Sequence, residues 1–370
     1  MNIIKALTFL IVILSTTVGC STQTSEAENN SISSEKFDST MSESNDLLKD
    51  TSELSQQDLI MNSTPSKYSY DNMVEDINRL QNKHGEKIQV KKLCDTIDGR
   101  SVYDIIIGDP QGENQVLIFG AMHAREYITT QIVMRQLCDC IDTLNGHSGE
   151  YNGISTMELL QDMTIHFVPM SNPDGVTISQ FGLSKINNET IRNNLSAMSN
   201  GNYEQWKANA AGVDLNRNFD AGWQEFVGSS APSSDRYKGS FPGSEPEAAA
   251  LINLVNNNNI KRTISYHTCG ALIYWYYKQQ GNVLAQSEVF AKRISNTTGY
   301  PLDSDYTAVD AAGFKDWAVY KMGIPSLTIE VGDESGDWVD NPVPIKYLSG
   351  IWSHNKDVVY ATLYNLKYEN

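Results

Sequence analysis

The chain of 370 residues lacks the short motifs that mark several large classes of protein. It contains no P-loop, no G-x-G-x-x-G fingerprint and no H-E-x-x-H motif, which excludes the usual nucleotide-binding and zincin sites. Its formal net charge is −17 and no cluster of Lys and Arg occurs, so nucleic acid is excluded as a partner. With five cysteines, it also lacks a disulfide framework.

The composition is typical of a folded globular protein. Hydrophobic residues make up 40% and charged residues 20%, which is enough to bury a large core and excludes a collagen-like or wholly disordered protein. Cys138 and Cys140 lie two apart on a predicted helix and point to different faces, so we do not expect them to pair.

The N-terminal residues predict export. Lys5 precedes the apolar run ALTFLIVIL, which is too short to span a bilayer and fits the core of a signal peptide over residues 1–19. Residues 17–20, TVGC, resemble a bacterial lipoprotein signal in which Cys20 becomes the lipidated first residue, although Thr17 departs from it. We therefore expect a lipid anchor on the outward face of the bacterial cell membrane. Ordinary secretion, with Cys20 removed or free, is the alternative.

Two further segments follow. Residues 20–66 are rich in Ser, Thr, Asn, Glu and Asp and have few large apolar residues, which predicts a disordered polar stalk. Residues 67–370 are then expected to form one large domain, which we expect to be a monomer.

Helical and strand patterns alternate along this domain. They predict a single α/β domain with a mixed, mostly parallel twisted sheet and helices on both faces. A turn is expected at SNPDG (171–175), and a capping box is expected between Ser244 and Glu247. The predicted strands are 87–94, 102–108, 115–121, 163–170, 263–267, 271–277 and 326–332, and the predicted helices are 69–85, 128–146, 244–257, 283–296 and 313–323.

Metal-ligand side chains follow several of these strands. His123 and Glu126 lie three apart after one strand, and His267 and Glu330 lie at the ends of two others. In such sheets the ligand site lies beyond the carboxyl ends of the strands. Imidazole nitrogen and carboxylate oxygen are zinc ligands, and a catalytic zinc site uses three of them with one position open. His166, within a strand, is instead expected to pack inside the domain.

Six motifs in the same order resemble the zinc carboxypeptidase family, typified by pancreatic carboxypeptidase A. The resemblance covers almost all of the chain from Tyr68 onward and implies that fold and a peptidase activity. The motifs are H-A-R-E (123–126), S-N-P-D-G (171–175), G-V-D-L-N-R-N-F (212–219), Y-K-G-S-F-P-G-S-E-P-E (237–247), S-Y-H-T (265–268) and K-D-W-A (315–318).

The resemblance assigns the catalytic residues. It implies one Zn²⁺ per chain, held by His123, Glu126 and His267, with Asp214 accepting the other N–H of a ligand imidazole. Glu330 matches the family's catalytic glutamate, which takes a proton from water and passes it to the leaving amine.

The resemblance also assigns the substrate contacts. Asn216 and Arg217 match the residues that bind the substrate's terminal carboxylate, and Arg125 matches a residue of the next subsite. Lys315 falls at the position that reads the side chain beyond the scissile bond, where an ammonium favours a negative group. The motif W-K-A-N-x-x-G-V-D-L-N-R-N-F is similar to the bacterial branch that cuts γ-D-glutamyl–diaminopimelate bonds in peptidoglycan stem peptides.

Three departures alter the expected site. Lys207 stands where the family has an oxyanion-stabilising Arg, and it can supply the charge but not the bidentate fork. The family's mobile Tyr has no counterpart at its ungapped position, Ala308, so Tyr306 is the candidate by proximity. Cys269 stands where the animal enzymes have a Tyr in the cleft. The stalk is too short for an inhibitory pro-domain, which predicts activity without cleavage.

Two other functions stay open at this point. One is a carboxypeptidase of broad specificity that acts on ordinary peptides. The other is a non-catalytic binding lipoprotein on the same scaffold. The aromatic run at 274–277 fits either the sheet core or the wall of a substrate cleft.

Overall fold

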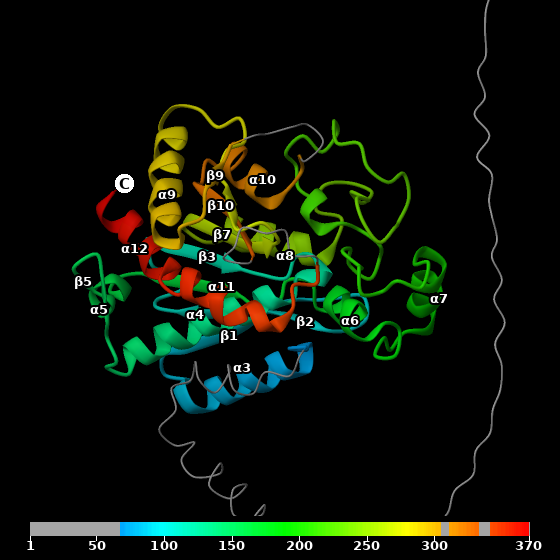
Figure 1. The fold of residues 1–370 in the computed structure, drawn as a ribbon, viewed down its shortest axis with the longest axis horizontal. Coiled ribbons are helices and arrows are strands. Elements are labelled where there is room, and N and C mark those ends of the chain that lie inside the picture. The colour runs from blue at the N-terminus through cyan, green and yellow to red at the C-terminus, as the bar shows by residue number, and fades with distance from the viewer. Residues whose placement is uncertain (1–66, 305–310, 333–340, 370) are drawn as a thin grey trace, which may run out of the picture. The chain divides into compact units, whose positions relative to one another are not determined.

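An eight-stranded sheet forms the centre of the protein in the computed structural model, which describes residues 67–304, 311–332 and 341–369 (Figure 1). Its strands are β1 (Ile88–Asp95), β2 (Ser101–Ile107), β3 (Gln115–Phe119), β6 (Thr164–Val168), β7 (Ile260–Thr268), β8 (Leu272–Tyr274), β9 (Leu302–Asp303) and β10 (Ser326–Val331). A separate hairpin pairs β4 (Glu150–Tyr151) with β5 (Ile154–Ser155).

The strand order is β1-β2-β6-β3-β7-β10-β8-β9. The four middle strands β6, β3, β7 and β10 are parallel to one another, while β1, β2 and β8 pair antiparallel with their inner neighbours. This confirms the predicted mixed, mostly parallel sheet. The carboxyl ends of the middle strands therefore meet at one edge of the sheet, which is where a ligand site is expected.

Helices cover both faces of the sheet, as predicted. Side chains alternate along β3, so Val116 and Ile118 pack into one core cluster while Leu117 and Phe119 pack into the other. Figure 1 shows α4 and α11 on one side of the central strands and α10 on the other. The helices are α3 (Tyr70–His84), α4 (Ile128–Leu144), α5 (Thr156–Leu160), α6 (Pro173–Phe181), α7 (Glu189–Met198), α8 (Pro246–Asn256), α9 (Gly281–Thr298), α10 (Phe314–Tyr320), α11 (Leu348–Asn355) and α12 (Val358–Tyr368), with 3-10 turns η1 (Ala124–Glu126), η2 (Leu215–Arg217) and η4 (Ile345–Tyr347).

Two predictions about helix starts are wrong. SNPDG is not a turn between elements but the start of α6, because the Asn172 side chain accepts from the amide of Gly175 and Pro173 fits the first helical turn. The capping box at Ser244 does not form, since α8 starts after Glu245 and the Ser244 hydroxyl donates to the Glu245 carboxylate at 2.8 Å.

The predicted strand 271–277 is also too long. Only Leu272–Tyr274 pair with the sheet, as β8, and Tyr277 is buried beyond its end. Five helices of the structure were not predicted. They are α5, α6, α7, α11 and α12, at 156–160, 173–181, 189–198, 348–355 and 358–368.

Some predictions lie outside the described residues, namely the signal peptide 1–19, Cys20, the stalk 20–66, Tyr306 and Ala308. Among the described residues, no helix combines the length and the apolar character that crossing a membrane requires. No disulfide joins the four cysteines in this part of the chain, namely Cys94, Cys138, Cys140 and Cys269.

Candidate zinc centre

Three side chains converge at the carboxyl edge of the sheet. The Nδ1 atom of His123 lies 2.8 Å from Oε1 of Glu126, and the Nδ1 atom of His267 lies 2.9 Å from Oε2 of the same carboxylate. The two Nδ1 atoms are 3.1 Å apart. All three residues are buried, and their ligand atoms lie within 4.8 Å of one another. We call His123, Glu126 and His267 the metal cluster.

The chain folds locally so that His123 and Glu126 face the same point. After the buried strand β3, His123 has an extended backbone and the 3-10 turn η1 brings Glu126 back beside it. Thr129 fixes this turn, because its hydroxyl donates to the Glu126 carbonyl at 2.8 Å and accepts from the Ala121 amide at 2.7 Å. His267 arrives from the neighbouring strand β7.

The charges within the metal cluster are interdependent. Burial disfavours the Glu126 carboxylate, but the two imidazoles outweigh burial and lower the pKa of Glu126 below its ordinary value. Burial likewise opposes protonation of His267, and the Glu126 carboxylate outweighs it and raises the pKa of His267. An anion is therefore held ionised in a buried place, which is the electrostatic condition for binding a cation.

The cluster fits zinc in number and type of ligand. It offers two imidazole nitrogens and one carboxylate oxygen, the set of three protein ligands that leaves a fourth tetrahedral position for a reactant. In the part of the chain that the structure describes, no other group of His, Cys, Asp and Glu side chains converges in this way. The predicted zinc site is thus present in the fold.

A carboxylate stands behind the ring of His123. Oδ1 of Asp214 is 3.2 Å from Nε2 of His123, the nitrogen that points away from the cluster. Asp214 is buried, and Lys207 and His123 lower its pKa well below the ordinary value despite that burial. A carboxylate in this position sets the tautomer and orientation of a ligand imidazole.

Lys207 lies between two carboxylates. Its Nζ atom is 3.3 Å from Oδ2 of Asp214 and 3.2 Å from Oδ1 of Asp235, and its side chain is 12% exposed. The ammonium is therefore held next to the metal cluster. Asp235 was not predicted as a site residue, because a single Asp in a loop carries no sequence signal for this ion pair.

Glu330 lies beside the metal cluster. In the parallel pair of β10 and β7, Glu330 is in register with His267, so the two side chains lie on the same face of the sheet. Burial raises the pKa of Glu330 to about 7, with the nearby charges of His267, Lys207 and Arg217 acting in the opposite direction. A carboxyl group with a pKa near neutrality is suited to proton transfer.

Three of the predicted substrate residues, Asn216, Arg217 and Lys315, lie on segments that are in contact. The Arg217 guanidinium donates to the Asn216 carbonyl at 2.8 Å and lies over the Phe226 ring, 5.2 Å from its centroid. The Asn216 side chain accepts from the amide of Phe314 at 3.0 Å, at the start of α10. Lys315 comes next on that helix.

Lys315 and Arg125 have partners within the protein. The Lys315 ammonium donates to the Tyr276 carbonyl at 2.9 Å and to the Asp316 carboxylate at 2.6 Å. It also lies 5.7 Å from the centroid of the Tyr277 ring, so the aromatic run contributes to its surroundings. Arg125 donates to the Gln205 carbonyl at 3.3 Å.

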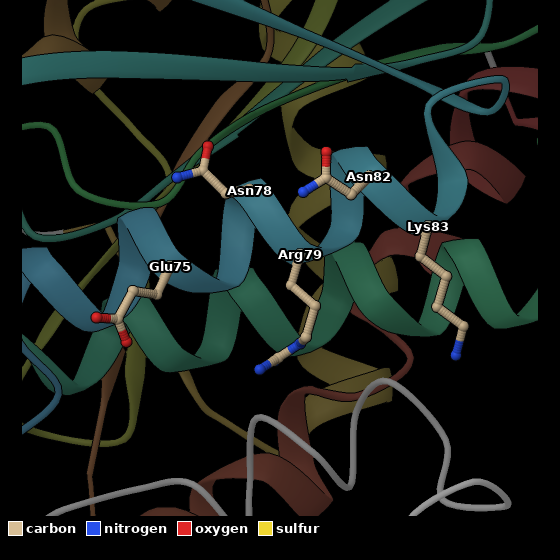
Figure 2. A pocket seen from close by; sticks show the side chains of 5 residues that line it. All are labelled: Glu75, Asn78, Arg79, Asn82 and Lys83. Carbon is tan, nitrogen blue, oxygen red and sulfur yellow. The ribbon is translucent and has the colours of Figure 1, made fainter.

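His166 and two surface hollows lie apart from the metal cluster. His166 is buried in β6 and contacts Asp104 and Gln115 at 2.8 and 2.9 Å, which confirms the expected packing role. A shallow, open surface hollow of about 550 Å³ lies along α3 and is lined by Glu75, Asn78, Arg79, Asn82 and Lys83 (Figure 2). A second, of about 190 Å³, is lined by 110–111, Gln115 and 256–259. Neither is lined by a predicted site residue.

A mostly parallel sheet with two buried imidazoles and one buried carboxylate at its carboxyl edge is the arrangement of a zinc-dependent hydrolase of the α/β class. The chain belongs to the zinc carboxypeptidase family, whose sequence profile matches residues 73–356. It is therefore a zinc metallopeptidase, and the predicted fold, cofactor and enzyme class are confirmed.

Individual relatives in sequence support the same family, and solved structures share its fold. The chain is 31% identical over 302 residues to gamma-D-glutamyl-L-diamino acid endopeptidase 1 of Lysinibacillus sphaericus, covering 80% of this chain and 72% of that one. It is 26% identical to human mast cell carboxypeptidase A, covering 74% and 66%. Among solved structures, carboxypeptidase A of Helicoverpa armigera matches with a TM-score of 0.63 at 17% identity, covering 90% of this chain and 82% of that one. Thrombin-activatable fibrinolysis inhibitor matches with a TM-score of 0.66 at 20% identity, covering 85% and 80%.

Proposed function

We propose that this peptidase hydrolyses the γ-D-glutamyl–diaminopimelate bond of peptidoglycan stem peptides, next to a free carboxylate. The observation that carries the proposal is that Asn216 connects the two segments that carry the cationic side chains Arg217 and Lys315. Arg217 follows Asn216 in the chain, and the Asn216 side chain binds the start of the helix that carries Lys315. A diaminopimelate residue at the end of a stem presents two carboxylates. Similarity to an enzyme named for a γ-D-glutamyl–diamino acid bond supports the same substrate class.

The residues around the metal cluster divide the chemistry between them. When bound, zinc supplies the Lewis acid that polarises the scissile carbonyl and makes a water molecule more acidic. Glu330 takes the proton from the attacking water and delivers it to the leaving amine. The Lys207 ammonium donates to the oxyanion that develops on the carbonyl oxygen. Asp214 keeps the ring of His123 in the orientation that ligates.

The substrate carboxylates are bound by two different cations. The planar fork of Arg217 suits bidentate binding of the terminal carboxylate, and the Phe226 ring restricts the guanidinium to one plane. Lys315 uses two of its three N–H groups on Tyr276 and Asp316, which leaves one for the side-chain carboxylate of diaminopimelate. Arg125 lines the subsite on the other side of the scissile bond, and Tyr306 is our candidate for closing the cleft.

A carboxypeptidase of broad specificity is the second candidate. Similarity to human mast cell carboxypeptidase A over 74% of this chain supports it. The two candidates differ in the role of Lys315, since only a substrate with an acidic side chain next to the scissile bond gains from its charge.

Digestion of defined peptides tests the proposal. Recombinant residues 66–370 loaded with zinc are incubated with the L-Ala-γ-D-Glu-diaminopimelate tripeptide and with ordinary peptides, and products are identified by mass. We expect release of free diaminopimelate without prior trimming of the enzyme, and Lys315→Met should reduce kcat/KM for the stem more than for ordinary peptides. Intact stems beside trimmed ordinary peptides would overturn the proposal in favour of the second candidate.

We also propose that the chain acts as a monomer outside the bacterial cell membrane, anchored by a lipid on Cys20. The lipoprotein-like residues 17–20 support this, and stem peptides are accessible from that side of the membrane. Mass analysis of the mature N-terminus tests it. A diacylated Cys20 is expected, whereas an unmodified N-terminus in the culture medium indicates ordinary secretion.

A further inference from the structure

The backbone of Thr268 contacts the ligand carboxylate directly. Thr268 follows His267 at the end of β7 and is 5% exposed. Its N–H donates to Oε2 of Glu126 at 3.3 Å, the oxygen that also faces Nδ1 of His267. Because the terminal torsion of a Glu side chain is soft, donors of this kind decide how its carboxylate is oriented. The position of Thr268 therefore bears on zinc binding.

The side-chain amide of Asn341 binds Thr268 at two points. Its Oδ1 atom accepts from the Thr268 hydroxyl, and its Nδ2 atom donates to the Thr268 carbonyl at 3.2 Å. One planar group thus restrains both the side chain and the backbone of Thr268. With these two groups held, the N–H of Thr268 is left pointing at Glu126.

A third segment holds Asn341 in place. The Gln205 side chain donates to the Asn341 carbonyl at 2.5 Å, and the Gln205 carbonyl accepts from Arg125 at 3.3 Å. Gln205 lies two residues before Lys207 in the same loop. The contacts therefore connect Thr268, which follows the ligand His267, through Asn341 to the loop that carries Lys207.

We propose that Asn341 is a positioning residue for the zinc site, which acts through Thr268 to orient the Glu126 carboxylate. The inference rests on the metal cluster and not on any particular substrate. Hydrogen-bond partners of metal ligands typically contribute about 10- to 100-fold to metal affinity, and Asn341 acts one residue further out. A lower zinc affinity is the signature of this role, because a clamp that only ties a loop to β7 would change stability alone.

Zinc affinity measured by competition with a chromophoric chelator, without any peptide, tests this inference. Asn341→Ala should weaken zinc binding about tenfold. Thr268→Val, which loses the hydroxyl but keeps its N–H, should weaken it less, and Thr268→Ser should restore it. Gln205→Ala loses the outer bond to the Asn341 carbonyl but leaves both bonds between Asn341 and Thr268 in place, so it should weaken zinc binding less than Asn341→Ala does.

The thermal melting temperature of each metal-free variant separates a positioning role from a structural one. An Asn341→Ala protein that melts lower but binds zinc as tightly as the wild type would overturn the inference. If Asn341→Ala does not fold, the pair Thr268→Val and Thr268→Ser decides, and equal zinc affinities for that pair would also overturn it. Peptide hydrolysis is not measured, so an error in the proposed substrate cannot affect the result.

Discussion

In the cluster of Asp98, Arg100 and Asp174, a guanidinium pairs with two buried carboxylates, whereas in the metal cluster the buried carboxylate faces two imidazoles, which carry a charge only when protonated. One Nη atom of Arg100 lies 2.7 Å from Asp98 and 2.8 Å from Asp174. Asp98 also accepts from the amides of Asn187 and Asn188, and Asp174 accepts from the amide of Asp98. We call this the arginine-centred cluster, and its anions have a permanent cation.

The metal cluster has no such permanent cation among its three residues. Glu126 faces two imidazoles that are both zinc ligands in type, and Nε2 of His267 has no hydrogen-bond partner within the described residues. The ammonium of Lys207 pairs with Asp214 and Asp235 instead of Glu126. The comparison teaches that a buried carboxylate indicates a metal site where the surrounding side chains are metal ligands in type and provide no permanent positive charge.

Glu247 is a third case, in which a buried carboxyl is kept neutral. It is 1% exposed, and Asn209 donates to it at 3.3 Å. Burial, together with the charges of Asp174 and Glu245, raises the pKa of Glu247 to about 8. A buried carboxyl group is thus ionised beside imidazoles, paired with Arg, or protonated, according to its neighbours.

The largest expected effect comes from Glu330→Gln, which keeps the size of the side chain but removes the base. We expect kcat to fall about 10²- to 10⁴-fold, because general acid–base catalysis contributes that much. Bound zinc should stay at the wild-type level, since Glu330 is not one of the three converging ligands. Peptide hydrolysis and metal content are measured on the same preparation. Full activity in this variant would rule out Glu330 as the base.

Lys207→Ala should lower kcat about 10²- to 10³-fold, the usual effect of removing one donor to a developing oxyanion. Lys207→Arg is the matched control, because it keeps the charge between Asp214 and Asp235 and should retain most of the rate. Steady-state kinetics with a single peptide give the comparison. If Lys207→Ala hydrolyses the peptide as fast as the wild type, Lys207 has no part in the reaction.

Arg100→Met breaks the arginine-centred cluster and should affect stability rather than zinc binding. Removing one partner from a buried ion pair leaves unpaired charge, so we expect the free energy of unfolding to fall by about 3 kcal/mol. Urea titration measures the loss, and zinc content at low temperature should be unchanged. Loss of zinc from a folded Arg100→Met protein would contradict the separation of the two clusters.

The smallest expected effect concerns Glu247 and pH. Its pKa is higher in the folded protein than its ordinary value of 4.5, so the folded state binds the extra proton and stability falls as pH rises from about 4.5 to about 8. Glu247→Gln stays neutral and should lose less stability over that range. Melting temperatures at pH 6 and pH 9 test this. An equal change in both proteins would show that Glu247 is not the group responsible.

The central strands could be predicted from local pattern, whereas the metal ligands were assigned from six ordered motifs that resemble the zinc carboxypeptidase family. The apolar residues of β3 indicate a buried strand, and His123 and Glu126 follow it, while His267 lies at the end of β7. The start of α6 was missed although Asn172 and Pro173 are ordinary helix-start residues, because the same dipeptide also suits a turn.

The supporting contacts could not be predicted in the same way. Asp235 and Asn341 lie in loops, and their partners Lys207 and Thr268 are distant in sequence. A single polar residue in a loop gives no periodic signal, so only the tertiary fold brings such pairs together. The arginine-centred cluster likewise depends on Asp174 approaching Arg100 across 74 positions of the chain.

Metal content tests the central claim most directly, namely that His123, Glu126 and His267 together bind one zinc ion. Purified residues 66–370 and the His267→Ala variant are dialysed against a weak chelator, and zinc is measured by mass spectrometry. We expect one zinc per wild-type chain and a large loss in His267→Ala, with Arg100→Met as the matched control that keeps its zinc. A folded wild-type protein without stoichiometric zinc, or a His267→Ala protein that retains it, would contradict the account.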